Sequence, residues 1–345
     1  MLPPQSRLAL LQQWARVTAM TARAIFAPAS AVLTDELSAA VKAAAARLAR
    51  KNGGLAVASG PANENYWNVF DAIVKAGNTP ARPMVNITTR GTLENLRLLR
   101  DGAVTAVILR GDEAALAAKG EGPFEHAGAV PDLRALAGLF PEALHVVVMG
   151  TSPIASVADL FGKRVTIVRS GTAAALEAGD ILRAHRVSLA ALAATPNELP
   201  IDAALAALKR GERDAVILTA PAPSPALRDF AVANPVRFLP LDADAVALLT
   251  TGTSNYVAVT VPAQTYPGQG RPIVTVGVAA LLVSSAQIAP REAEALLQRV
   301  FTELDFMQAG SPFSAMMKVA SSHRGVTLPL HEGAEAFYSA TASQK

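Results

Sequence analysis

The side chains that most often carry out chemistry are sparse in this sequence, and their spacing assembles no catalytic or metal site. The histidines are His126, His145, His185, His323 and His331, and no two of them lie four residues apart beside a glutamate, as a helix-borne zinc site requires. Cysteine is absent, which excludes disulfides, thiolate zinc sites and cysteine nucleophiles. Neither a G-x-S-x-G turn nor a G-x-G-x-x-G turn occurs. We therefore expect no enzymatic activity, no cofactor and no bound metal.

A strand, a short polar loop and a helix follow one another at three places in the chain. Ligands bind outside the carboxyl ends of strands in open parallel sheets, and the free N–H groups of a helix start favour anions. Together the loops indicate a binding site, although Thr92 and Thr172 are more safely interpreted as helix caps, and Asn63 is a cap before it is a ligand contact. The loops supply the candidate binding residues Ser59, Asn63, Arg90, Gly91, Thr92, Arg169, Ser170, Gly171 and Thr172.

The elements that must hold these loops are short apolar strands alternating with helical patterns. Such alternation is typical of parallel sheets covered by helices, so we predict an α/β protein with two such sheets. The predicted strands are residues 55–59, 84–88, 105–109, 144–149, 165–168, 215–219, 236–239 and 273–283. The predicted helices are residues 63–76, 92–100, 172–185, 201–210, 242–250 and 290–308.

Composition and charge exclude two classes of protein. With 345 residues, of which 51% are hydrophobic and 17% charged, the chain has the balance of a folded protein rather than a disordered one. The net charge is +3, but residues 1–51 hold seven basic and two acidic residues, so the remainder is slightly acidic. A duplex-binding surface needs clustered cations on the folded body. We therefore expect no nucleic-acid partner.

Residues 1–52 are predicted to be a helical extension. Arginines interrupt the apolar stretches of its first part, so it holds no transmembrane helix. Residues 1–31 match a secretory signal only in part, because residues 29–31 fit a small-x-small cleavage site while Gln12, Gln13 and Arg16 break the apolar stretch. An amphipathic helix that packs on the body is the favoured interpretation, and an atypical secretory signal is the alternative. The mature N-terminus distinguishes the two, since an exported protein would begin near Val32.

Several segments together resemble a known family. Thr89-Arg-Gly-Thr-Leu-Glu-Asn-Leu-Arg-Leu-Leu99 is similar to the T-G-G-S-x-E-N-L-R-L-L segment of the TAXI family, the solute-binding proteins of TRAP-type transporters. Similar segments follow in the family's order at residues 133–137, 144–148, 159–165, 170–172, 220–226, 266–269, 275–283 and 329–335. The resemblance spans roughly residues 55–338.

The resemblance implies a two-lobed, type II periplasmic binding protein fold with a ligand cleft between the lobes. Lobe I would comprise residues 53–150 with 252–345, and lobe II residues 151–251. Such a protein is expected to be a periplasmic monomer. It would capture a small anionic solute, a carboxylate such as glutamate or a dicarboxylate, and deliver it to the membrane subunits of a TRAP-type transporter.

The resemblance also places individual residues at the cleft. Arg90 stands where the family commonly has glycine and Arg169 where proline is usual. One arginine from each lobe would clamp a carboxylate, because a guanidinium binds carboxylates bidentately. Gly91 and Gly171 would allow close backbone approach. Tyr66 is expected to wall the cleft while its neighbour Trp67 faces the core, and Pro221 and Ala222 would border the ligand.

Two other functions fit the same fold. A ligand sensor that remains in the cytoplasm would explain the atypical N-terminal segment. An enzyme that makes a pyrimidine precursor of thiamine is disfavoured, because that chemistry relies on a cysteine-rich segment and this chain has no cysteine.

Overall fold

The computed structural model describes residues 54–62, 64–77, 83–168, 174–193, 197–251, 255–302, 317–319, 322–323 and 325–342, together with the single positions 37, 41 and 48. The predicted extension, residues 1–52, therefore lies almost wholly outside the described residues. No described helix is both long enough and apolar enough to cross a membrane.

Lobe I is built on three parallel strands. The order β2-β1-β3 follows from the pairing of β1 with both of its neighbours. Its strands are β1 (Leu55–Gly60), β2 (Met84–Thr88) and β3 (Ala106–Arg110), and its helices are α3 (Asn65–Gly77), α4 (Thr92–Arg100), α5 (Gly111–Lys119), α10 (Pro290–Thr302) and α12 (Glu332–Ala342), with the 3-10 turn η1 (Gly122–Phe124).

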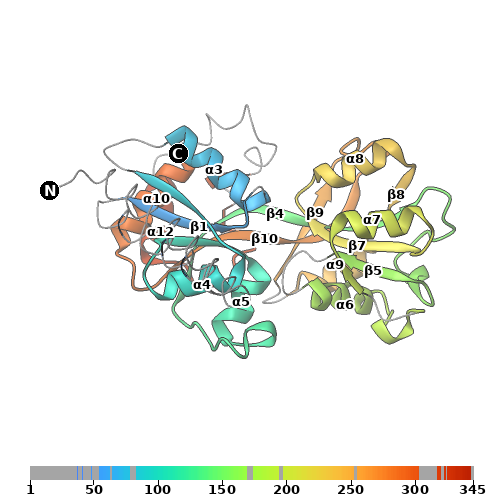
Figure 1. Cartoon of the computed structure of the whole chain (residues 1–345), viewed down its shortest axis with the longest axis horizontal. Helices are drawn as coiled ribbons and strands as arrows, with labels where there is room; N and C mark the ends of the chain where they lie inside the picture. The colour runs from blue at the N-terminus through green and yellow to red at the C-terminus, as the bar shows by residue number, and fades with distance from the viewer. Residues whose placement is uncertain are drawn as a thin grey trace, which may run out of the picture.

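Helices cover both faces of the lobe I sheet (Figure 1). Because side chains alternate along a strand, Val57 packs with α3, α10 and α12 while Ala56 and Ala58 pack with α4 and α5. Helix α4 shows why these elements form where they do. Glu94 lies in its first turn and Arg97 and Arg100 in its last, which matches the helix dipole.

Lobe II repeats this arrangement. Its central strand β7 pairs with β5 in parallel, and β5 pairs with β6. The elements of this part of the chain are β5 (Val165–Val168), β6 (Asn197–Leu199), β7 (Ala215–Ala220), β8 (Val236–Phe238), β9 (Tyr256–Val261), α6 (Ala174–Ala184), α7 (Ile201–Lys209), α8 (Pro225–Ala233) and α9 (Ala243–Leu249), with 3-10 turns η2 (Ala158–Leu160) and η3 (Leu189–Ala191). One face of the sheet packs on α6 and α9, the other on α7 and α8.

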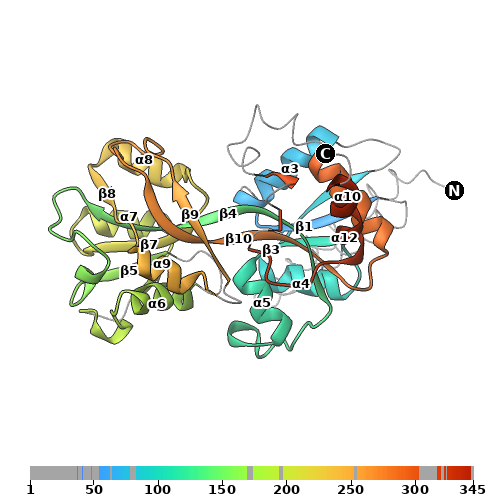
Figure 2. The same cartoon turned by 180° about the vertical axis from the view of Figure 1, so that it is seen from behind.

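Two long strands join the lobes, as Figures 1 and 2 show from opposite sides. They are β4 (Leu133–Met149) and β10 (Ile273–Ser285), and they pair antiparallel from Gly277↔Ala143 to Ser285↔Leu133. The second half of β10 pairs with β3 of lobe I, whereas the second half of β4 pairs with β7 of lobe II. The described strands consequently form one ten-stranded sheet rather than the two that we predicted.

The sequence predictions for the elements succeeded where the apolar runs are unbroken. Strands 84–88 and 165–168 and helix 92–100 are confirmed to the residue. The prediction for β4 was too short, because Arg134, Gly138 and Pro141 interrupt its first half. The helices α5, α8 and α12 and the strands β6 and β9 were missed. The predicted final helix is described only as far as Thr302.

The predicted lobe boundaries at residues 150 and 252 stay predictions. Strand β4 already pairs with lobe II elements before residue 150. Strand β9, which the predicted boundary assigns to lobe I, pairs with the first half of β10 and contacts α9. This pairing indicates that the return crossing lies within β10 itself.

Candidate functional site

A cleft of about 1100 Å³ opens between the two lobes. Its walls come from the carboxyl ends of β1, β3 and β7 and from the starts of α4 and α8. Cavities that hold small organic ligands typically measure about 300–1,000 Å³. This cleft is therefore large enough to enclose such a molecule.

The lobe I wall begins at the end of β1. Ser59 is buried, and its hydroxyl donates to Oδ1 of Asn86 at 2.5 Å. Tyr66, on α3, lines the cleft and packs its ring against Phe140, with the ring centroids 6.1 Å apart. Its neighbour Trp67 instead donates from Nε1 to Thr88 at 2.9 Å. Adjacent positions of α3 thus face different parts of the lobe.

The start of α4 forms the next part of this wall. Gly91 precedes the helix with φ of 129°, a conformation that only glycine adopts readily, and no side chain caps the helix. The hydroxyl of Thr92 donates to Oε2 of Glu113 at 2.5 Å, so this residue does not act as the predicted cap. The side chain of Arg90 is 63% exposed, and its Nε donates to Glu94 at 3.3 Å.

The lobe II wall contains Ala220 at the end of β7 and Ser224, Pro225 and Ala226 at the start of α8. The hydroxyl of Tyr266 holds this turn in place. It accepts a hydrogen bond from the backbone N–H of Ser224 at 3.0 Å and lies 2.9 Å from Nε2 of the buried His145.

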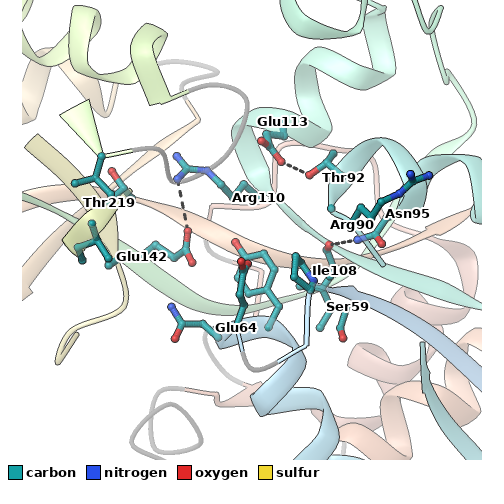
Figure 3. Close-up of a pocket in the computed structure, with 18 of the residues that line it drawn as sticks. Ser59, Glu64, Arg90, Thr92, Asn95, Ile108, Arg110, Glu113, Glu142 and Thr219 are labelled. Atoms are coloured by element: carbon teal, nitrogen blue, oxygen red, sulfur yellow. Dashed lines mark hydrogen bonds and ion pairs between the residues drawn. The ribbon is translucent and has the colours of Figure 1, made fainter. Parts of the chain in front are cut away.

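A buried charged cluster forms the floor of the cleft (Figure 3). Arg110, at the end of β3, pairs with Asp112 through two hydrogen bonds of 3.1 Å. It also donates to Glu177 of α6 in lobe II at 2.7 Å, and its Nη1 lies 3.7 Å from Glu142 of β4. All four side chains are at most 8% exposed. The cluster therefore ties lobe I, lobe II and a crossing strand together.

Burial and mutual attraction act in opposite directions on the pKa values of this cluster. Burial raises the pKa of Glu142 to about 7, against the attraction of Arg110, and it raises the pKa of Glu177 for the same reason. Burial lowers the pKa of Arg110, but Glu177, Asp112 and Glu142 outweigh it and hold that pKa well above its ordinary value. Arg110 stays charged, whereas Glu142 exchanges its proton near neutral pH.

The chain is similar to known proteins in sequence and in fold. A family model described as the NMT1-like family matches residues 57–340. The chain belongs to the NMT1-like family. Among solved structures it is similar to the periplasmic aliphatic sulphonate binding protein SsuA from Escherichia coli, at 16% identity over 83% of this chain and 82% of that one, with a TM-score of 0.51. A TctC solute binding protein from Polaromonas gives 13% identity over 85% and 98% of the two chains, with a TM-score of 0.49.

At such identities the likeness to SsuA shows the fold, which is the predicted two-lobed fold of the periplasmic binding proteins. The narrower assignment to TAXI proteins is taken up with the proposed function.

In this NMT1-like protein, five of the predicted site residues lie together at the cleft. Ser59, Tyr66, Arg90, Gly91 and Thr92 line the cleft. Pro221 and Ala222 do not, since the described residues that line this part of the cleft are their neighbours at positions 220 and 224–226. The remaining candidates, Asn63, Arg169, Ser170, Gly171 and Thr172, lie outside the described residues. That these residues contact a ligand remains a prediction.

Sequence reasoning missed the charged floor of the cleft. Arg110, Asp112 and Glu113 directly follow the apolar run of β3, so they obey the same strand-end rule as the loops that were identified. Glu142 gives no such signal, because it stands in the middle of a long strand whose first half we did not predict.

The raised pKa of Glu142 leads to a prediction about how the free energy of unfolding depends on pH. A group whose pKa is raised in the folded state contributes stability that is present below its unfolded pKa, near 4.5, and is lost as the pH rises through about 7. We expect Glu142→Gln to leave stability nearly unchanged at pH 5 and to raise it at pH 8, by at most on the order of 3 kcal/mol. Urea unfolding at both pH values measures this difference.

The matched control is Glu335→Gln, which removes a carboxylate from an exposed position on α12. We expect it to change stability equally at both pH values. Burial lowers the pKa of His145 to about 4, so His145 makes the stability of the folded protein rise with pH below pH 6.5. This effect is the same in the parent and in both variants. A Glu142→Gln variant with the parent's pH dependence would contradict the account of the floor.

Proposed function

We propose that this NMT1-like protein is a solute-binding protein, which captures a small organic solute in the cleft and closes its two lobes around it. The observation that carries the proposal is the cleft itself, whose walls come from both lobes while β4 and β10 connect them. A solute that contacts both walls stabilises the closed arrangement relative to the open one. The proposed role is binding rather than catalysis, which the binding function of SsuA supports.

We further propose that the solute carries a carboxylate and is delivered in the periplasm to the membrane subunits of a TRAP-type transporter. The start of α4 supports the carboxylate, because it lines the cleft without a side-chain cap and helix N-termini favour anions. Arg90, which pairs with Glu94, lines the same edge and presents an exposed guanidinium there. The resemblance of residues 89–99 to TAXI proteins supports the transporter.

Thermal unfolding with a panel of solutes tests the proposal. We expect at least one carboxylate, from a panel of amino acids, dicarboxylates and keto acids, to raise the unfolding temperature by several degrees. A solute at 100 times its dissociation constant adds about 2.7 kcal/mol to the free energy of unfolding. Neutral sugars serve as the control. If only sugars raised the unfolding temperature, the carboxylate assignment would fail, and if no solute did, solute capture would fail.

A further inference from the structure

The buried charges of the cleft floor do not balance among the described residues. Arg110 is the sole buried cation of those that line the cleft there, whereas Asp112, Glu113, Glu142 and Glu177 are buried carboxylates in or directly behind the same wall. Even with Glu142 protonated, these residues carry more negative than positive charge. Buried charge is costly unless it is paired. A further cation beside these carboxylates would lower that cost.

The four carboxylates differ in how well they are satisfied. Asp112 accepts two hydrogen bonds from Arg110, Glu177 accepts one of 2.7 Å, and Glu113 accepts one from Thr92. Glu142 has the longest of these contacts, 3.7 Å to Arg110. Of the three described carboxylates around Arg110, Glu142 is also the one that lines the cleft (Figure 3). Glu142 is thus the carboxylate of the Arg110 cluster that a donor group of a solute in the cleft can reach.

A second polar group lies beside Glu142 without a well-formed hydrogen bond. The hydroxyl of Tyr66 is fully buried and lies near enough to the Glu142 carboxylate to lower the pKa of that group, yet it has no partner of ordinary hydrogen-bond geometry among the described residues. Buried hydroxyls are nearly always hydrogen-bonded, so each exception calls for an explanation. A donor that sits between this hydroxyl and Glu142 would satisfy both.

We propose that the captured solute carries a positively charged nitrogen, an ammonium or guanidinium group, that docks on Glu142 beside the hydroxyl of Tyr66. This inference rests on the proposed function, since it names a chemical group of the same solute. An organic cation fits better than a metal ion, because the described residues contain no group of three or more acidic or histidine side chains arranged to hold one.

Four charged or titratable groups of the described residues face Glu142 and determine how binding of a cationic solute to it depends on pH. They are Arg110 of β3, Asp112 of α5, Glu177 of α6 and Tyr66 of α3. Since the carboxyl group of Glu142 is close to half protonated near pH 7, a docking cation displaces a proton. The affinity for a cationic solute should therefore rise as the pH rises through neutrality, and binding should release protons.

Calorimetric titration with matched solute pairs tests the inference. The pairs are glutamate against glutarate, alanine against propionate, and putrescine against 1,4-butanediol, which differ in the amino groups. We expect an amine-bearing member to bind more tightly than its partner by about tenfold or more, as a hydrogen bond between charged groups contributes. Glu142→Gln should remove that difference, and Glu335→Gln should preserve it. Titration near pH 7 in buffers of different ionisation enthalpy should show a release of about half a proton.

Each other outcome overturns a specific statement. If glutarate or propionate binds at least as tightly as its amine-bearing partner, or Glu142→Gln leaves the preference unchanged, the cation site is wrong while solute capture stands. If no solute binds, the proposed function fails as well. Calcium chloride that binds with the same dependence on Glu142 would show an inorganic ion site instead. Should Glu142→Gln unfold, Tyr66→Phe takes its place, and an unchanged amine preference in that variant overturns the inference.

Discussion

Replacing Arg110 by methionine is expected to lower the free energy of unfolding by about 3–5 kcal/mol at pH 7, because it leaves Asp112, Glu177 and Glu142 buried without their cation. Methionine keeps much of the side-chain volume, so the loss reflects charge rather than a cavity. The cost should shrink at pH 5, where the raised pKa values of Glu142 and Glu177 favour their neutral forms. Chemical unfolding at the two pH values measures both effects.

The control is Arg164→Met, which removes an equally close ion pair at the surface. Arg164 lies 2.6 Å from Asp214, but its side chain is 44% exposed. Solvent screening limits such a pair to about 1 kcal/mol or less. Equal costs for the two substitutions would mean that the buried cluster does not hold the lobes together.

Replacing Gly277 by alanine is expected to cost about 1–3 kcal/mol or more, because it overpacks the crossing of β4 and β10. A Cβ at this position would overlap the carbonyl oxygen of Glu142 and lie 3.0 Å from both the Glu142 carbonyl carbon and Cγ2 of Val259. These neighbours are largely backbone and cannot move aside. Because residue 277 pairs with β4 on one side and β9 on the other, the strand has no free direction to shift.

Gly270→Ala is the matched control for this prediction. Gly270 also has ordinary backbone geometry, and nothing lies within 4 Å of the position that its Cβ would occupy. We expect its unfolding temperature to stay within about a degree of the parent's, and that of Gly277→Ala to fall by several degrees. If both variants melted with the parent protein, the tight crossing between the lobes would be wrong.

The parts of the fold that the sequence predicted are those with local signals. Helix α4 has one acidic residue at its start, two basic residues at its end and an apolar face, and its predicted bounds are correct. Strand β4 lacks such a signal, because Pro141 and Glu142 interrupt its apolar pattern. Both residues nevertheless pair with β10, and this tertiary pairing overrides propensity. The single continuous sheet follows from long-range pairing of β4 with β10, which no local pattern encodes.

The candidate site divides in the same way. Loops after strands identified Ser59 and Arg90, which line the cleft, because the carboxyl ends of parallel strands meet at one edge of a sheet. The charged floor could not be predicted, because its residues lie far apart in the sequence. Arg110, Glu142 and Glu177 are separated by at least 32 residues from one another, and only the fold shows that they meet.

Hydrogen exchange with and without the panel solute that most raises the unfolding temperature tests the central claim, that one solute binds between the lobes. We predict slower exchange at the start of α4 in lobe I, residues 90–97, together with residues 218–220 and 224–226 of lobe II, since residues of both segments line the cleft. Slowing that is confined to one lobe, or that centres on the surface groove around residues 264–270, would contradict the account.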